Sequence, residues 1–188
     1  VELPVAAVGD DDVQFGHISN EEMKQTVCPI DSNAHAYYIF DYGHTYFKYA
    51  STKVVSDDPS TGRKGFQIWI ERHFRIKILD KDGLDMANFS IPLYHNKGDE
   101  EVINSIRGRT YNLVDGKIEK SKLKWKDVIV EETSEHWNKQ KFTMPDVHPG
   151  SIIEVEYTIV SDYPFNLNDW HFQRHIPVLQ SDYYVKIP

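Results

Sequence analysis

The chain has 188 residues, of which 40% are hydrophobic and 13% aromatic, enough for one globular domain with a sizeable buried core. Its formal net charge of -8 argues against a nucleic-acid-binding surface, which needs clustered Lys and Arg, and against simple adsorption to anionic lipid. No apolar run approaches the ~20 residues that span a bilayer, and the single cysteine, Cys28, excludes an internal disulfide.

Residues 1–30 are expected to form an N-terminal arm with one short helix. Residues 1–16 show no regular pattern, and the acidic patch Gly9–Asp12 is most simply a solvated loop. The sequence Ser19–Glu22 fits a capping box, which predicts a helix from there to about Gln25. The chain begins at Val1 without a signal peptide and stops just after an apolar run, so we expect both ends to be cuts in a longer protein.

Residues 31–188 are predicted to form one β domain. Ala34–Tyr42 and Thr45–Lys53 are expected as strands on either side of a bend at Gly43, followed by a turn-rich loop at Asp57–Gly62. The clearest strand is Phe66–Leu79, where apolar and polar residues alternate with a period of two. Its apolar face carries Phe66, Ile68, Ile70, Phe74, Ile76 and Ile78, interrupted by Arg72, and its other face carries Gln67, Trp69, Glu71, His73, Arg75 and Lys77.

The second half of the chain continues the same pattern. Asn88–His95 is a possible strand that Pro92 would push toward an edge or a bulge. Val102–Val114 and Lys117–Glu119 form a predicted hairpin around the favoured turn dipeptide between them. Residues 121–138 are charged and ambiguous.

The segment Lys141–Tyr157 is the most informative stretch. Its prolines and Gly150 separate a short strand, Lys141–Met144, from a longer one, Ser151–Ser161. The final strands are predicted at Asp169–His175 and Gln180–Ile187. Many strands, tight turns and almost no helix predict an antiparallel β-sandwich, or a strongly curved sheet, with one short N-terminal helix.

Candidate reactive groups do not combine into a recognisable site. His171 and His175 have a metal-like spacing, but on a strand they would be about 13 Å apart, which is too far for one zinc ion. Cys28 lacks the context that activates a nucleophile and is interpreted as a small hydrophobic residue. We therefore expect no catalytic residue, no metal and no cofactor.

Two other groups leave alternatives open. Glu154 and Glu156 lie on one strand face about 6–7 Å apart, a spacing that glycoside hydrolases use, although such pairs are usually the wet face of a sheet. Trp69 lies on the polar face of its strand, so it is the tryptophan most suggestive of a ligand surface, although packing against a second layer is the commoner use.

Short blocks spread over most of the chain carry a family resemblance. They are Phe15-Gly16, Asp31–Ala36, Phe40–Gly43, Arg72–Leu84, Thr110–Asn112, Asp115–Lys117, Lys141–Tyr157, Trp170–Gln173, Ile176–Val178 and Ser181–Tyr183. The ordered set resembles the bacterial family of domains of unknown function that lie N-terminal to transglutaminase-like domains in exported multi-domain proteins. The resemblance implies a β-sandwich, a secretion signal in the precursor and a papain-like catalytic core downstream, whose reactive residues are not matched here.

Three functional hypotheses follow. The first is a non-catalytic accessory domain of an exported transglutaminase-like protein that positions protein or peptide substrate for the downstream domain, which would be its partner. The second is a module that binds glycan or cell-wall peptide through Trp69. The third is a glycoside hydrolase. For docking, the expected surface lies near the C-terminal end, at Ser181, Asp182 and Tyr183, because a short linker would hold the partner close.

Overall fold

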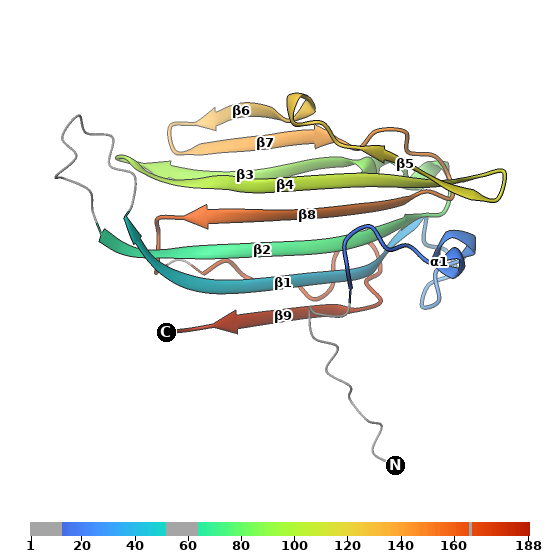
Figure 1. Ribbon diagram of the computed structural model, residues 1–188, viewed down its shortest axis with the longest axis horizontal. Coiled ribbons are helices and arrows are strands. Elements are labelled where there is room, and N and C mark those ends of the chain that lie inside the picture. The colour runs from blue at the N-terminus through green and yellow to red at the C-terminus, as the bar shows by residue number, and fades with distance from the viewer. Residues whose placement is uncertain (1–12, 52–63, 166) are drawn as a thin grey trace, which may run out of the picture.

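The computed structural model describes residues 13–51, 64–165 and 167–188 and shows a mainly β chain (Figure 1). The helices in this described part are the α-helix α1 (Asn20–Lys24) and the 3-10 helices η2 (Lys81–Ala87) and η3 (Trp125–Asp127). None of the described helices is long and apolar enough to cross a membrane. The strands are β1 (Ala36–Ser51), β2 (Lys64–Ile78), β3 (Asn88–Asn96), β4 (Asp99–Val114), β5 (Lys117–Lys122), β6 (Ile129–Ser134), β7 (Trp137–Thr143), β8 (Ile152–Ser161) and β9 (Ser181–Lys186).

All of these strands belong to one open sheet of mixed direction. Its order is β6-β7-β3-β4-β8-β2-β1-β9, with β5 beside β4. Paired strands run antiparallel except β1 and β9, which pair in parallel from Asp41↔Ser181 to Tyr46↔Lys186. The prediction of a mainly β fold is confirmed. The prediction of a purely antiparallel arrangement is wrong at this edge, because the chain crosses from β8 to the far side of β1 before it forms β9.

The sheet is strongly curved, and a separate second sheet is not seen among the described strands. In a flat sheet β3 and β2 would be about 14 Å apart, since β4 and β8 lie between them. The ring of Phe89 on β3 nevertheless lies 5.4 Å from the ring of Phe74 on β2. The sheet therefore folds back on itself near β3 and β4, which pair only at His95↔Glu100 and Asn96↔Asp99. The sandwich is thus not confirmed, whereas strong curvature is observed.

The main hydrophobic core fills the inside of this curve. One face of β1, β2, β4 and β8, called here the core face, packs against β3 and β7. Its largest buried members are Phe74, Ile76, Ile78, Ile153 and Val155, all at most 1% exposed. The predicted apolar face of β2 is confirmed at Phe74, Ile76 and Ile78. At Pro92, β3 pairs with β7 on one side only, because its pairing with β4 is confined to His95 and Asn96.

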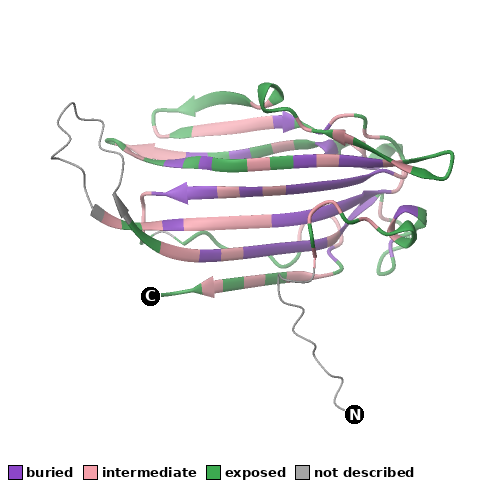
Figure 2. Ribbon diagram, in the orientation of Figure 1, coloured by how far each residue is buried: buried purple, intermediate pink, exposed green. Residues whose placement is uncertain are grey.

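The opposite face of the sheet, called here the polar face, is half covered by the N-terminal segment. In Figure 1 the chain before α1 crosses in front of β1 and β2, and α1 lies beside the right-hand ends of these strands. Figure 2 shows that burial in β1 and β2 is concentrated in that half. The predicted capping box is confirmed, since Ser19 Oγ accepts from the backbone N–H of Glu22 and the Glu22 carboxylate accepts from the backbone N–H of Ser19. Met23 of α1 packs with Tyr111 and Ile152.

Gly43 is not a bend, contrary to the prediction. It lies inside the single long strand β1 and pairs with Arg72 of β2. The reason for a glycine here is space on the core face, because a Cβ atom would overlap the indole ring of Trp170. Trp170 in turn stacks on Tyr183 of β9, with ring centroids 4.8 Å apart and planes 2° from parallel. Gly43 thus allows Trp170 to pack between β1 and β9.

We expect Gly43→Ala to lower the free energy of unfolding by about 1–3 kcal/mol, because the added methyl group overpacks the Trp170 site. Gly65→Ala is the matched control, since an added methyl group there would meet nothing within 4 Å and the residue is also on a strand. Urea unfolding followed by far-UV circular dichroism measures both. Equal stabilities for the two variants would contradict this role of Gly43.

The remaining predicted elements have mixed outcomes. The hairpin at Asp115–Gly116 is confirmed, with positive φ angles of 50° and 77° at its two turn residues. The strand predicted at Asp169–His175 is wrong, because that segment is an irregular connection leading to β9. The patch Gly9–Asp12 and the loop Asp57–Gly62 lie outside the described residues.

Candidate functional site

The polar face carries a buried network of charged side chains. Strand alternation places His73, Arg75 and Lys77 of β2 on this face, and Arg75 pairs in register with Glu154 of β8. All four side chains belong to buried residues, and Glu154 and Lys77 are fully buried. Because charges are buried in proteins only when they are paired or hydrogen-bonded, this face is part of the interior rather than a solvated surface.

Glu154 is the centre of the network. Its Oε1 accepts from Arg75 Nη2 at 2.7 Å and lies 3.0 Å from His73 Nε2, while its Oε2 accepts from Tyr111 Oη at 2.6 Å and the backbone N–H of Gly16 at 2.8 Å. Burial alone would raise the pKa of Glu154, but the hydrogen bond from His73, the charge of Arg75 and the hydrogen bond from Tyr111 together lower it to about 2. The expectation that this residue lies on a wet face is therefore wrong.

The same network holds the N-terminal segment against the sheet. Arg75 donates to Glu22 Oε1 at 2.5 Å and to the carbonyl oxygen of His17 at 3.0 Å. Lys77 Nζ donates to the carbonyl oxygen of Met23 at 2.7 Å, and burial lowers the pKa of Lys77 to about 8. Main-chain atoms of residues 16–23 thus take part directly in the charge network, so this segment is packed on the sheet as part of the same domain.

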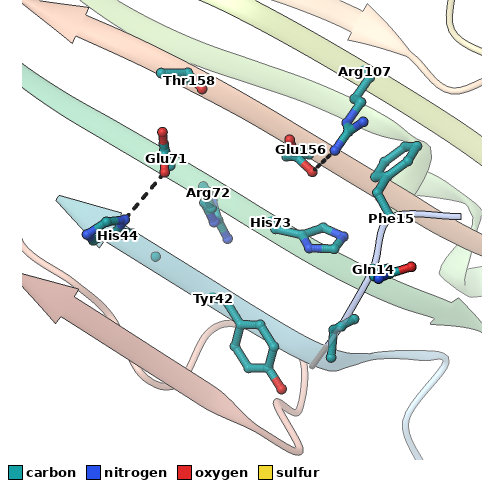
Figure 3. A pocket seen from close by; sticks show the side chains of 12 residues that line it. Gln14, Phe15, Tyr42, His44, Glu71, Arg72, His73, Arg107, Glu156 and Thr158 are labelled. Carbon is teal, nitrogen blue, oxygen red and sulfur yellow. Dashed lines mark hydrogen bonds and ion pairs between the residues drawn. The ribbon is translucent and has the colours of Figure 1, made fainter. Parts of the chain in front are cut away.

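A groove lies beside the first described residues of the N-terminal segment (Figure 3). It has a volume of about 460 Å³, within the range of about 300–1,000 Å³ typical of ligand pockets. Side chains from β1, β2, β4, β8 and the segment before α1 line it, as Figure 3 shows. The lining residues are Val13, Gln14, Phe15, Tyr42, Gly43, His44, Glu71, Arg72, His73, Arg107, Glu156 and Thr158.

The charges along this groove are held in pairs. His44 Nδ1 lies 3.4 Å from Glu71 Oε2, and the other oxygen of Glu71 accepts from Tyr46 Oη at 2.7 Å. Arg107 Nη2 donates to Glu156 Oε2 at 2.6 Å, and both side chains of this pair are partly exposed. The groove therefore offers both signs of charge together with hydrogen-bonding groups.

Phe15 forms one wall of the groove. The guanidinium carbon of Arg107 lies 4.4 Å from the Phe15 ring centroid, and the ring also lies 5.8 Å from that of His73. This contact connects the exposed pair Arg107–Glu156 to the N-terminal segment. A ligand in the groove would consequently contact the segment as well as the sheet.

Trp69 lies farther along the polar face and is half-buried. Its ring is close to parallel with that of Tyr46, with centroids 6.1 Å apart and an interplanar angle of 20°. Lys48 Nζ lies 3.5 Å from the Trp69 ring centroid, so a cation already covers the indole. The two aromatic rings could still serve as a platform if Lys48 moved aside.

The three C-terminal candidate residues belong to the edge strand β9 and do not face one common surface. Ser181 accepts a hydrogen bond from Trp170 Nε1 at 3.1 Å, and Tyr183 Oη donates to Thr45 Oγ1 at 2.9 Å. Asp182 is exposed and accepts from Gln180 Nε2 at 2.9 Å. Ser181 and Tyr183 thus take part in holding β9 against β1, and the structure does not bring these three residues together with Trp69.

Other candidate groups remain apart. Cys28 is buried and free, as expected of a small hydrophobic residue. His171 and His175 are exposed, and His175 Nε2 lies 3.3 Å from Met86 Sδ.

A separate group of possible metal ligands is His35, Asp80 and Asp82, whose ligand atoms lie within 4.8 Å of one another. His35 Nδ1 lies 2.8 Å from Asp80 Oδ2, and this hydrogen bond raises the pKa of His35 and lowers that of Asp80. Asp80 Oδ1 also accepts the backbone N–H of Asp82 at the start of η2. An exposed ion pair beside a helix cap accounts for this arrangement, so we assign no metal to it.

Sequence reasoning missed the groove and the buried network. The available signal was the run of polar residues on one face of β2, which includes four titratable side chains, together with two glutamates at alternate positions on β8. Such a run can be a solvated face or a buried network, and the sequence pattern is the same for both. Whether this face is solvated or buried depends on the N-terminal segment that covers it. That segment contacts Glu154 through Gly16, 138 positions away in the chain, so local sequence does not reveal the contact.

The chain resembles known proteins over its larger, C-terminal part. A family model described as a domain of unknown function with a solved structure (DUF3857) matches residues 67–188. Among solved structures, the crystal structure of a "putative protease" from Parabacteroides distasonis ATCC 8503 matches with 12% sequence identity and a TM-score of 0.45. That match covers 68% of this chain and 23% of the other, so the chain spans less than a quarter of that protein's length. No curated protein matches the chain.

Proposed function

This chain belongs to the DUF3857 family of domains, and we propose that it is a non-catalytic accessory domain that binds a stretch of protein substrate in the groove. In this proposal a catalytic domain elsewhere in the same polypeptide acts on the bound substrate. The observation that carries the proposal is the groove of about 460 Å³, whose two non-buried carboxylates, Glu71 and Glu156, are both held by hydrogen-bonding partners.

Held carboxylates suit binding better than catalysis. A general acid needs a pKa near the working pH, whereas the pKa of Glu154 is lowered to about 2, so this residue stays ionised at neutral pH. Glu156 is paired with Arg107. These properties oppose a glycoside hydrolase that uses Glu154 and Glu156.

The composition of the groove favours a polypeptide ligand. Peptides present backbone donors and acceptors together with charges of both signs, and the pairs His44–Glu71 and Arg107–Glu156 can exchange partners with such groups. Phe15 adds an aromatic contact at one wall. Association with a transglutaminase-like domain, and export from the cell, are further parts of the proposal that rest on the ordered sequence blocks of the family resemblance.

Peptide binding tests the proposal directly. Fluorescence anisotropy would be measured with labelled, unstructured peptides of about eight residues, a length that spans roughly 26 Å when extended. We expect at least one peptide to bind, and Arg107→Ala and His44→Ala each to weaken its binding by about tenfold, equivalent to about 1.4 kcal/mol. Lys141→Ala removes a comparably exposed ion pair with Glu131, away from the groove, and should leave binding unchanged.

The same assay separates the alternative function. Trp69 and its neighbour Tyr46 form a partly exposed aromatic pair, which favours a glycan platform as the second candidate. Oligosaccharide binding that is lost in Trp69→Ala but kept in Arg107→Ala would support that function and overturn the peptide proposal. Peptide binding that neither groove variant weakens would also overturn it, as would the absence of binding at millimolar peptide.

A further inference from the structure

A second buried charge cluster lies on the core face, on the other side of the sheet from the groove. Asp41 of β1 is fully buried and receives hydrogen bonds from two arginines. Arg72 donates from Nε to Oδ1 at 2.7 Å and from Nη2 to Oδ2 at 2.8 Å. Arg174, from the connection between β8 and β9, donates from Nε to Oδ2 at 2.7 Å. Both carboxylate oxygens are therefore engaged.

The cluster holds more positive than negative charge. Arginine remains protonated in proteins, so two guanidinium groups face one carboxylate. Among the described residues, the ion pairs of both arginines go to Asp41. The side chains of Arg72 and Arg174 are 16% and 21% exposed, so the surplus charge is only partly hydrated. A partly dehydrated cation with spare N–H donors is a favourable partner for an anion.

A cavity adjoins these arginines. It has a volume of about 260 Å³ and lies between the β1, β2 and β8 part of the curved sheet and the β3 and β7 part. Its polar lining includes Arg72 and Arg174 together with the hydroxyl of Tyr38, whose pKa is raised by burial. The volume is slightly below the range of about 300–1,000 Å³ for drug-sized ligands, so the occupant should be small.

The rest of the cavity lining is mostly apolar and aromatic. Phe74, Phe89 and Phe142 follow one another in ring contact, with centroids 5.4 Å and 5.1 Å apart. An occupant would therefore meet two guanidinium groups at one part of the cavity and phenyl rings at another. That combination selects a molecule with a charged end and an apolar body, and it disfavours inorganic anions, which have no apolar part.

We propose that this cavity is a binding site for a small carboxylate with an apolar body, the chemistry of a free aromatic or aliphatic acid and also of the C-terminal residue of a peptide. The carboxylate contacts Arg72 and Arg174, and the apolar body packs on the phenylalanine rings. The site lies on the opposite face of the sheet from the groove and shares only Arg72 with the groove lining, so it does not depend on the function proposed for the groove.

Isothermal titration calorimetry on the unaltered protein tests this inference. The probes are 3-phenylpropionate and its uncharged amide, 3-phenylpropionamide, and we expect the acid to bind at least tenfold more tightly. A short peptide ending in Phe with a free carboxylate would be compared with its C-terminally amidated form. Binding of the peptide acid that is tighter than that of both its amidated form and 3-phenylpropionate identifies a chain terminus as the ligand, and any other order identifies a free acid.

Arg174→Gln tests whether the arginine pair binds the carboxylate, because it removes the surplus positive charge and leaves Asp41 paired with Arg72. We expect this variant to bind the acid at least tenfold more weakly and the amide unchanged. Lys141→Gln is the control, because Lys141 forms a partly exposed ion pair with Glu131 and lines neither the cavity nor the groove, and it should bind like the unaltered protein. Equal affinity for acid and amide, or no binding of the acid at millimolar concentration, would overturn the inference, as would acid binding that Arg174→Gln does not weaken. Even if the variant does not fold, the comparison of acid with amide on the unaltered protein shows whether the site requires a carboxylate.

Discussion

Glu154→Gln should lower the free energy of unfolding by about 3–5 kcal/mol, since removing one member of a buried ion pair leaves its partners uncompensated. Arg75 and His73 would face a neutral amide oxygen in place of a carboxylate, and Arg75 Nε already lacks a partner among the described residues. The new amide group would also place N–H donors against the hydroxyl of Tyr111 or the N–H of Gly16. The substitution keeps the shape of the side chain but removes its negative charge and one of its two acceptor oxygens.

Glu156→Gln is the control for this prediction. It lies two residues along the same strand, and its pair with Arg107 is partly exposed, so its loss should cost about 1 kcal/mol or less. Urea unfolding at neutral pH measures both variants. Similar losses for Glu154→Gln and Glu156→Gln would show that the buried network does not stabilise the fold.

The same residue predicts a dependence of stability on pH. The pKa of Glu154 is lowered from 4.5 to about 2 in the folded chain. A lowered carboxyl pKa contributes stability that is fully present above pH 4.5 and is lost as the pH falls toward 2. The shift corresponds to about 3 kcal/mol. The difference in stability between the unaltered protein and Glu154→Gln should therefore shrink over this pH interval, and a constant difference would contradict the assignment.

Asp41→Asn is expected to lower the free energy of unfolding by about 3–5 kcal/mol, because two partly buried guanidinium groups would lose the fully buried carboxylate that they share. The substitution keeps the size of the side chain, so the loss reports charge rather than packing. Asp182→Asn on the exposed part of β9 should change stability by less than about 0.5 kcal/mol. Chemical denaturation checks both, and a near-neutral Asp41→Asn would mean that solvent hydrates these arginines.

Much of the fold could be predicted because local patterns determine it. The alternation in β2, the capping box at Ser19–Glu22 and the turn at Asp115–Gly116 all depend on residues within a few positions of each other. The bend predicted at Gly43 is wrong because a glycine in a sequence can indicate either a turn or a close contact with another side chain. The contact here is with Trp170, which lies far along the chain, so the local sequence does not reveal it.

The functional surfaces were less accessible to sequence reasoning. Glu154 and Glu156 occupy equivalent positions in the sequence pattern of β8. Glu154 is nevertheless fully buried under the N-terminal segment, whereas Glu156 is partly exposed in the groove. Arg72 was visible as an interruption of an apolar face, which signals a buried partner but does not identify it. Asp41 meets it through the pairing of β1 with β2, whereas Arg174 joins them only because the connection before β9 returns to the edge of β1. Pairings of this kind are set by topology rather than by local pattern.

The parallel pairing of β9 with β1 also has a consequence for the order of folding. Asp41 and Ser181 are partners across 140 positions of the chain, and contacts between such distant positions form slowly because a long loop must first close. During synthesis the outer edge of β1 would stay open until β9 leaves the ribosome. An uncovered strand edge invites pairing with other chains, so this sheet should be most prone to self-association, and most dependent on chaperones, just before β9 docks.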